Sequence, residues 1–271
     1  MIASRVLGKS RTIRVLLPAG YDDPANAERR YPVLYMNDGQ NLFDVATSVF
    51  NRMEWRADET LRELTGRDEI QPMIIVGVDS AGRRGRGTEY LPYEDEYLRP
   101  AEPNPRGKYY PRFLTEEVLP LVNHKYRTKT DPASTGIGGS SYGALAALYA
   151  GMTRPDVFGR MLLESPSLYV GGGKILSDAK NTKAWPEKIY LGVGTNEGGR
   201  PNCSASDPTP EAVADVKKLE TVLKAAPNSP KLLTVVEQCA VHNENAWAKR
   251  LPDALRFLFA SQASAGTVRD R

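Results

Sequence analysis

The stretch Gly139-Ser140-Ser141-Tyr142-Gly143 matches the pattern Gly-x-Ser-x-Gly around Ser141. In this pattern a strand turns sharply into a helix, and the turn presents the central hydroxyl as a nucleophile. The residues two positions before and after the serine approach each other closely, so both are glycine. Ser140 fails the pattern because Tyr142 stands two positions after it. A helix-favouring run at 144–150 follows the turn. The sequence therefore predicts Ser141 as a nucleophile.

A serine nucleophile needs a base within hydrogen-bond reach, and the base needs an acid that orients it. The chain has two histidines, His124 and His242. Around a nucleophile elbow the chain order is serine, acid, histidine, which favours His242. His242 also follows an expected strand, at the strand end where open sheets place their active sites. His124 lies inside a helical pattern before Ser141, and we expect it at a helix surface.

Three carboxylates compete for the role of the acid. Glu197 lies just beyond the expected strand 188–194 and is our first choice. Asp207 lies in the loop that follows, and Glu164 ends an earlier expected strand. A Ser–His dyad without an acid is the remaining alternative.

Acyl transfer also needs hydrogen-bond donors for the developing oxyanion. We expect one to be the backbone N–H of Tyr142, the residue after the nucleophile. The second candidate is the backbone N–H of Gln40, in the stretch Asn37-Asp38-Gly39-Gln40-Asn41 after an early strand. A plain Asp-Gly turn without this role is the alternative reading of that stretch.

Short apolar runs alternate with longer helical patterns, which favours a doubly wound, mostly parallel sheet with helices on both faces. The expected strands are 12–18, 32–37, 73–79, 134–138, 161–164, 188–194 and 232–238. The expected helices are 51–65, 109–125, 141–153, 210–225 and 243–260. The first strand precedes any crossover helix and is expected to pair antiparallel at an edge. Pro252 predicts a kink or restart in the last helix.

Composition fits one α/β domain over 1–260 and a flexible polar tail over 261–271. A net charge of +3 in 271 residues gives no reason to expect nucleic acid or a membrane surface as partner. No apolar run reaches the length of a membrane span. The first 18 residues lack the apolar block of a signal peptide, so we expect a cytoplasmic protein unless a leader has been removed. No metal-ligand cluster or phosphate loop is found, and we expect no cofactor and no metal.

Three features leave alternatives open. Cys203 and Cys239 read best as free thiols, and the alternative is a disulfide that ties the loop after one strand of the site to the strand that ends at His242. Residues 80–108 read as a long loop, whose Arg83, Arg84 and Arg86 either attract an anionic substrate group or form a mixed-charge surface. The aromatic residues that either line a cleft or pack in the core are Trp55, Tyr93, Trp185 and Trp247.

With these residues in view, the chain resembles an esterase family of the α/β hydrolases. That family includes enterochelin-esterase-like enzymes, feruloyl and acetyl-xylan carbohydrate esterases, and esterase D. The matching segments are 31–41, 74–79, 88–90, 113–126, 138–143, 165–166, 194–197 and 242–247. The resemblance implies the α/β-hydrolase fold with little or no lid, with Ser141 as nucleophile and His242 as base. It places Glu197 where many relatives carry Asp, and Gln40 where an oxyanion N–H is supplied.

The resemblance implies a serine carboxylic ester hydrolase that forms an acyl-enzyme on acylated sugar, feruloyl or small acyl esters. A siderophore trilactone esterase of the enterobactin type is one alternative. A non-catalytic binding protein with the same fold is the other. The expected partner is a small-molecule or carbohydrate ester, and the sequence is compatible with a monomer or a homo-oligomer.

Overall fold

A seven-stranded sheet forms the centre of the computed structural model, which describes residues 1–49, 52–96 and 101–261. Its strand order is β3-β5-β4-β6-β7-β8-β9. The strands are β3 (Ile13–Leu16), β4 (Val33–Asn37), β5 (Ile74–Val78), β6 (Thr135–Ser140), β7 (Arg160–Glu164), β8 (Lys188–Gly194) and β9 (Lys231–Glu237). β3 pairs antiparallel with β5 at the edge and the other neighbours are parallel. The doubly wound sheet and its antiparallel edge strand are thus as predicted.

Eight α-helices cover this sheet in the described residues. They are α1 (Ala57–Gly66), α2 (Gly82–Tyr90), α3 (Tyr110–Phe113), α4 (Leu119–Lys125), α5 (Tyr142–Thr153), α6 (Val170–Lys180), α7 (Glu211–Lys224) and α8 (Glu244–Phe259). A π-helical segment, Leu114–Val118, joins α3 to α4, so the expected helix 109–125 is present. None of the described helices has both the length and the apolar character needed to cross a membrane.

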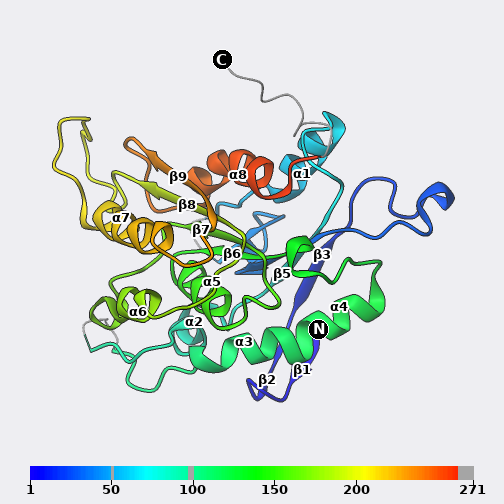
Figure 1. The fold of residues 1–271 in the computed structure, drawn as a ribbon, viewed down its shortest axis with the longest axis horizontal. Helices are drawn as coiled ribbons and strands as arrows, with labels where there is room; N and C mark the ends of the chain where they lie inside the picture. Colours follow the sequence, from blue (N-terminus) through cyan, green and yellow to red (C-terminus); the bar gives the residue numbers. More distant parts are fainter. Residues whose placement is uncertain (50–51, 97–100, 262–271) are drawn as a thin grey trace.

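Alternating side chains of the strands build a separate core on each face of the sheet. Leu34 and Met36 of β4 pack with α1 and α8, whereas Val33 and Tyr35 face the cluster that includes α3, α5 and α7. Figure 1 shows α1 and α8 together on one side of the sheet and α3 and α4 on the opposite side. This period-two alternation under two helical layers fixes which strand residues point into each core.

Several expectations need correction. The segment 80–108 is not a plain loop, because α2 begins at Gly82. The helix α6 was not expected, and its first turn holds three glycines at φ 61°, 67° and 76°. The last helix does not restart at Pro252, since α8 continues through it. The start of the expected helix 51–65 at residue 51, and the expected tail from 262 to 271, lie outside the described residues.

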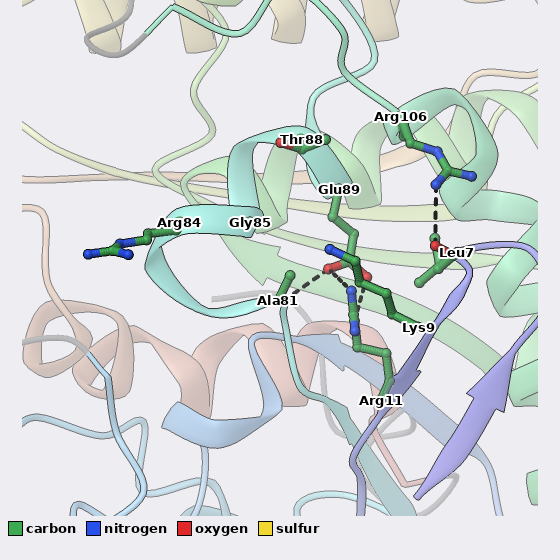
Figure 2. A pocket seen from close by; sticks show the side chains of 9 residues that line it. All are labelled: Leu7, Lys9, Arg11, Ala81, Arg84, Gly85, Thr88, Glu89 and Arg106. Carbon is green, nitrogen blue, oxygen red and sulfur yellow. Dashed lines mark hydrogen bonds and ion pairs between the residues drawn. The ribbon is translucent and has the colours of Figure 1, made fainter.

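An additional hairpin of β1 (Ile2–Ser4) and β2 (Lys9–Arg11) lies outside the main sheet. Its last residue, Arg11, forms a bidentate ion pair with Glu89 of α2, at 2.8 and 2.9 Å. Arg11 and Glu89 are only 8% and 5% exposed. The pair lines a cavity of about 410 Å³ between the hairpin and α2. Figure 2 shows the two side chains meeting there. The hairpin is thereby fixed to the helix.

Candidate active site

Ser141 occupies a strained turn between β6 and α5, with φ 56° and ψ −125°. A positive φ is uncommon for a residue with a side chain and costs about 1–3 kcal/mol. A Cβ atom at Gly139 would lie 2.8 Å from the backbone carbon of Gly143. A Cβ at Gly143 would lie 2.8 Å from Asp38 Oδ2. The two glycines are therefore required by the close approach that holds Ser141 on the bend.

The nearest hydrogen-bonding neighbour of Ser141 Oγ is Ser167 Oγ, at 3.4 Å. Among the described residues, His242 makes no hydrogen bond to Ser141. The two side chains nevertheless line one cavity of about 210 Å³. The cavity is lined by Asp38, Asn41, Arg86, Ser140, Ser141, His242, Glu244 and Trp247. Ser141 and the imidazole thus share a compartment without direct contact.

His242 and Glu197 are in direct contact, because β8 and β9 are neighbours and each is followed by a loop that carries one of them. His242 Nδ1 lies 2.5 Å from Glu197 Oε2. Glu197 Oε1 accepts hydrogen bonds from Gly194 N at 2.6 Å and Ser165 Oγ at 2.8 Å. Burial opposes the charge of Glu197, but the hydrogen bonds from His242, Gly194 and Ser165 lower its pKa below the ordinary value. The carboxylate is therefore held ionised beside the imidazole.

The other carboxylates considered from the sequence have different partners. Glu164 is fully buried and pairs with Arg250 at 2.6 Å. Asp207 accepts from Arg200 Nη2 at 3.3 Å and Ser204 N at 3.0 Å. His124 is exposed in the last turn of α4, as expected. Of the three candidate acids, only Glu197 hydrogen-bonds His242 within the part of the chain that the structure describes.

The preferred interpretation of the cysteines is wrong, because Cys203 and Cys239 form a disulfide. Cys203 lies in the loop after Glu197, and Cys239 lies three residues before His242. The bond therefore links the two loops that carry the carboxylate and the imidazole. It was the alternative weighed from the sequence.

The two candidate oxyanion donors are both backbone N–H groups at helix starts. Tyr142 is the first residue of α5, so its N–H has no acceptor within that helix. Gln40 lies in a buried 3₁₀ turn, Gly39–Asn41, whose backbone hydrogen bonds are donated by Asn41 and Leu42. The Gln40 side chain accepts from Ser80 N at 3.1 Å and donates to Ser80 Oγ at 3.2 Å, which fixes the turn.

Sequence reasoning missed the ion pair of Asp38 with Arg86, which lines the cavity of Ser141. Arg86 Nη2 lies 2.7 Å from Asp38 Oδ2 and 3.1 Å from Ser140 O. Its guanidinium also lies over the ring of Tyr142, 5.3 Å from the centroid. Arg86 thus connects α2 to both ends of the bend. Sequence gave no signal for this pairing, because Asp38 and Arg86 are 48 positions apart in unrelated segments.

The three arginines considered as an anion-attracting group do not act together. Arg86 is buried against Asp38, and Arg83 Nε donates to Val49 O at 2.9 Å. Arg84 lines the cavity beside the β1–β2 hairpin, where Figure 2 shows its side chain directed away from Arg11 and Glu89. The three arginine side chains therefore lie in different surroundings and do not form one anion-binding group.

The four aromatic residues considered as cleft-lining are all buried. Only one of them, Trp247, is among the residues that line the cavity of Ser141. Its ring meets the His242 ring edge-on, with centroids 5.1 Å apart, and its Nε1 donates to Ser165 Oγ at 3.0 Å. Trp247 thus contacts both the imidazole and Ser165, which donates a hydrogen bond to Glu197.

A second cavity of about 380 Å³ adjoins the first and shares His242 with it. Its lining includes Ser167, Tyr169, Glu197, Glu211 and Asp215. None of the described residues that line it is Lys or Arg. The imidazole therefore stands between a small compartment and a larger one whose charged side chains are acidic.

A mostly parallel sheet, with a nucleophile elbow after one strand and a histidine paired to a carboxylate after another, defines an α/β hydrolase. The family model Esterase, described as "Putative esterase", matches residues 4–258. The chain belongs to this family, and it is an esterase.

Individual relatives are distant. The chain is 21% identical to the uncharacterized protein YbbA of Bacillus subtilis, over 94% of this chain and 95% of that protein. It is 25% identical to an endo-1,4-beta-xylanase/feruloyl esterase of Xylanibacter ruminicola, over 94% of this chain but 30% of that protein. It superposes on the enterobactin esterase of Shigella flexneri, solved in the presence of enterobactin, with a TM-score of 0.71, 21% identity, and coverage of 95% and 57% of the two chains. The structural likeness supports the fold.

Proposed function

We propose that this esterase is a serine carboxylic ester hydrolase in which Ser141 is the nucleophile, His242 the base and Glu197 the orienting acid. The observation that supports the proposal is the shared cavity, which is lined both by a hydroxyl on a strained bend and by an imidazole that a largely buried carboxylate holds through Nδ1. With Nδ1 bound to Glu197, the imidazole keeps Nε2 for the nucleophile.

The reaction proceeds in two steps. His242 takes the proton of Ser141 as Oγ attacks the acyl carbon, and the backbone N–H groups of Tyr142 and Gln40 stabilise the oxyanion. The alcohol leaves with the proton from His242, and water then repeats the attack on the acyl-enzyme. Ser141 Oγ must turn from Ser167 toward His242 before attack. Such contacts are often long in ligand-free enzymes and shorten when substrate binds.

The proposed substrates are acylated sugar, feruloyl or small acyl esters. A polyanionic iron–catecholate complex of a siderophore fits the site less well. The larger cavity carries Glu197, Glu211 and Asp215, and the Arg86 charge in the smaller one is neutralised by Asp38. Siderophore trilactone hydrolysis is the second candidate because two of the relatives are named siderophore esterases.

The test is hydrolysis of short p-nitrophenyl esters by wild type and Ser141→Ala, with a fluorophosphonate probe to locate the nucleophile. Loss of the nucleophile is expected to lower kcat by about 10⁴-fold or more. Hydrolysis retained by a folded Ser141→Ala protein, or labelling at another residue, would reject the assignment. Acetyl, feruloyl and enterobactin-type esters compared side by side distinguish the two substrate classes.

A further inference from the structure

Glu244, the first residue of α8, is a buried carboxyl group on the wall of the small cavity that Ser141 and His242 line. It is 2% exposed. Its Oε1 accepts a hydrogen bond from Asn41 Nδ2 at 3.1 Å, and Asn41 is held in turn by Val49 N at 3.1 Å. In the part of the chain that the structure describes, no other residue hydrogen-bonds Glu244 Oε2. Its own backbone N–H also donates a hydrogen bond to the carboxyl group. A carboxylate accepts about four hydrogen bonds, so acceptor capacity remains toward the cavity that Glu244 lines.

The other carboxylate on this wall is engaged. Asp38 receives Arg86 Nε at 2.9 and 3.1 Å and Arg86 Nη2 at 2.7 Å, so its two oxygens are occupied. The pair leaves little net charge in the cavity beside Glu244. The proposed mechanism uses neither Asp38 nor Glu244. Of these two carboxyl groups, Glu244 is the one that can accept a further hydrogen bond from a substrate.

The surroundings of Glu244 also decide its charge. Burial raises its pKa to about 7, and Asp38 acts in the same direction, whereas the backbone N–H of Glu244, Arg86 and His242 act against them. The group therefore changes between a neutral carboxyl and a carboxylate near neutral pH. Both forms accept a hydrogen bond from a hydroxyl group, and the ionised form accepts the stronger one.

We propose that Glu244 is a specificity-determining residue that receives a hydroxyl group of the ester bound in the small cavity. The substrate class is an ester whose acyl or alcohol part carries a hydroxyl within reach of this wall, next to the aromatic face of Trp247. This inference rests on the proposed function, since it places the ester at Ser141. A site that hydrogen-bonds a substrate hydroxyl discriminates strongly against the analogue lacking it, because its own polar group is then left unpaired.

The experiment measures kcat/KM for two matched pairs of esters. Methyl 4-hydroxycinnamate is compared with methyl cinnamate, and 2-hydroxyethyl acetate with propyl acetate. For at least one pair, wild type is expected to prefer the hydroxylated ester by about 10- to 100-fold. Glu244→Ala is expected to bring this preference close to one, and the isosteric Glu244→Gln is expected to lower it in part. Glu63→Gln, a change of the same kind on the exposed surface of α1, is the control and is expected to keep the ratio.

A second readout distinguishes substrate binding from support of the fold. From pH 6 to 8 the wild-type ratio is expected to rise as Glu244 ionises, whereas in Glu244→Gln it stays flat. Any pH dependence of the chemical steps that the two esters of a pair share cancels in the ratio. If the variants do not fold, the pH profile of the wild-type ratio still tests the role of Glu244.

The outcomes are separable. Hydrolysis of all four esters with ratios near one in wild type, or with ratios that Glu244→Ala leaves intact, would overturn the role of Glu244. Absence of hydrolysis of any ester by wild type would instead count against the proposed function. A ratio that falls in both Glu244 variants and not in Glu63→Gln supports the inference.

Discussion

Ser165→Ala is the perturbation that most directly tests how Glu197 is held. Ser165 lies just after β7, between the strands that carry Ser141 and Glu197, and is 5% exposed. Its hydroxyl donates to Glu197 Oε1 at 2.8 Å and accepts from Trp247 Nε1 at 3.0 Å. The substitution removes a hydrogen bond to a charged group, worth about 1.5–3 kcal/mol, and leaves a buried indole N–H unpaired.

In the proposed mechanism part of that energy is expressed in catalysis, because Glu197 would stabilise the imidazolium that forms in the transition state. A share of about 1–2 kcal/mol lowers kcat/KM by about 5- to 30-fold. The assay is steady-state hydrolysis of a p-nitrophenyl ester by wild type and Ser165→Ala. Ser4→Ala removes a buried hydroxyl that accepts from Leu7 N in the β1–β2 hairpin, and it controls for a general loss of stability.

Acid unfolding supplies the second measurement. The pKa of Glu197 is lowered in the folded state, so its ionisation contributes stability above the unfolded-state pKa of about 4.3. That contribution is lost as pH falls through the folded pKa. Without the Ser165 hydroxyl the folded pKa rises toward the ordinary value, and acid unfolding is expected to begin at higher pH than in wild type. If Ser165→Ala keeps kcat/KM within twofold of wild type and unfolds in acid as Ser4→Ala does, the reasoning is refuted.

Two further changes test the supports around the site. Arg86→Ala leaves Asp38 buried without its partner, so the free energy of unfolding is expected to fall by about 3–5 kcal/mol, measured by urea denaturation. A loss below about 1 kcal/mol would show that the ion pair does not hold α2 against the bend. Cys203→Ser with Cys239→Ser opens a link between residues 36 apart and is expected to cost about 2–4 kcal/mol. Equal unfolding midpoints of the double variant and oxidised wild type would contradict this.

The strands were predictable because buried parallel strands are short apolar runs between breakers. Met73 to Val78 is such a run, and β5 occupies Ile74–Val78. The bend at Ser141 was predictable for a local reason, since close approach of the chain requires glycine on both sides. Such features are set by neighbours in sequence.

The helix α2 and the disulfide could not be predicted from the sequence, because both depend on residues that come into contact only in the folded chain. The helix α2 has the sequence GRRGRGTEY and buries Arg86, Glu89 and Tyr90, so no apolar periodicity marks it. Arg86 and Glu89 are buried as ion pairs with Asp38 and Arg11, and both of these partners are far away in sequence. The disulfide likewise depends on the adjacency of β8 and β9, which two cysteines alone do not reveal.

The double attachment of α2 has a consequence for the N-terminus. On one side of the helix, Arg86 forms an ion pair with Asp38 beside the bend at Ser141. On the other side, Glu89 forms an ion pair with Arg11 of β2. Deleting the first eleven residues would strip Glu89 of its counter-ion, although none of those residues lines the compartment of Ser141. The first eleven residues thus support α2 from the side opposite the bend, and we expect changes there to reach Ser141 through this helix.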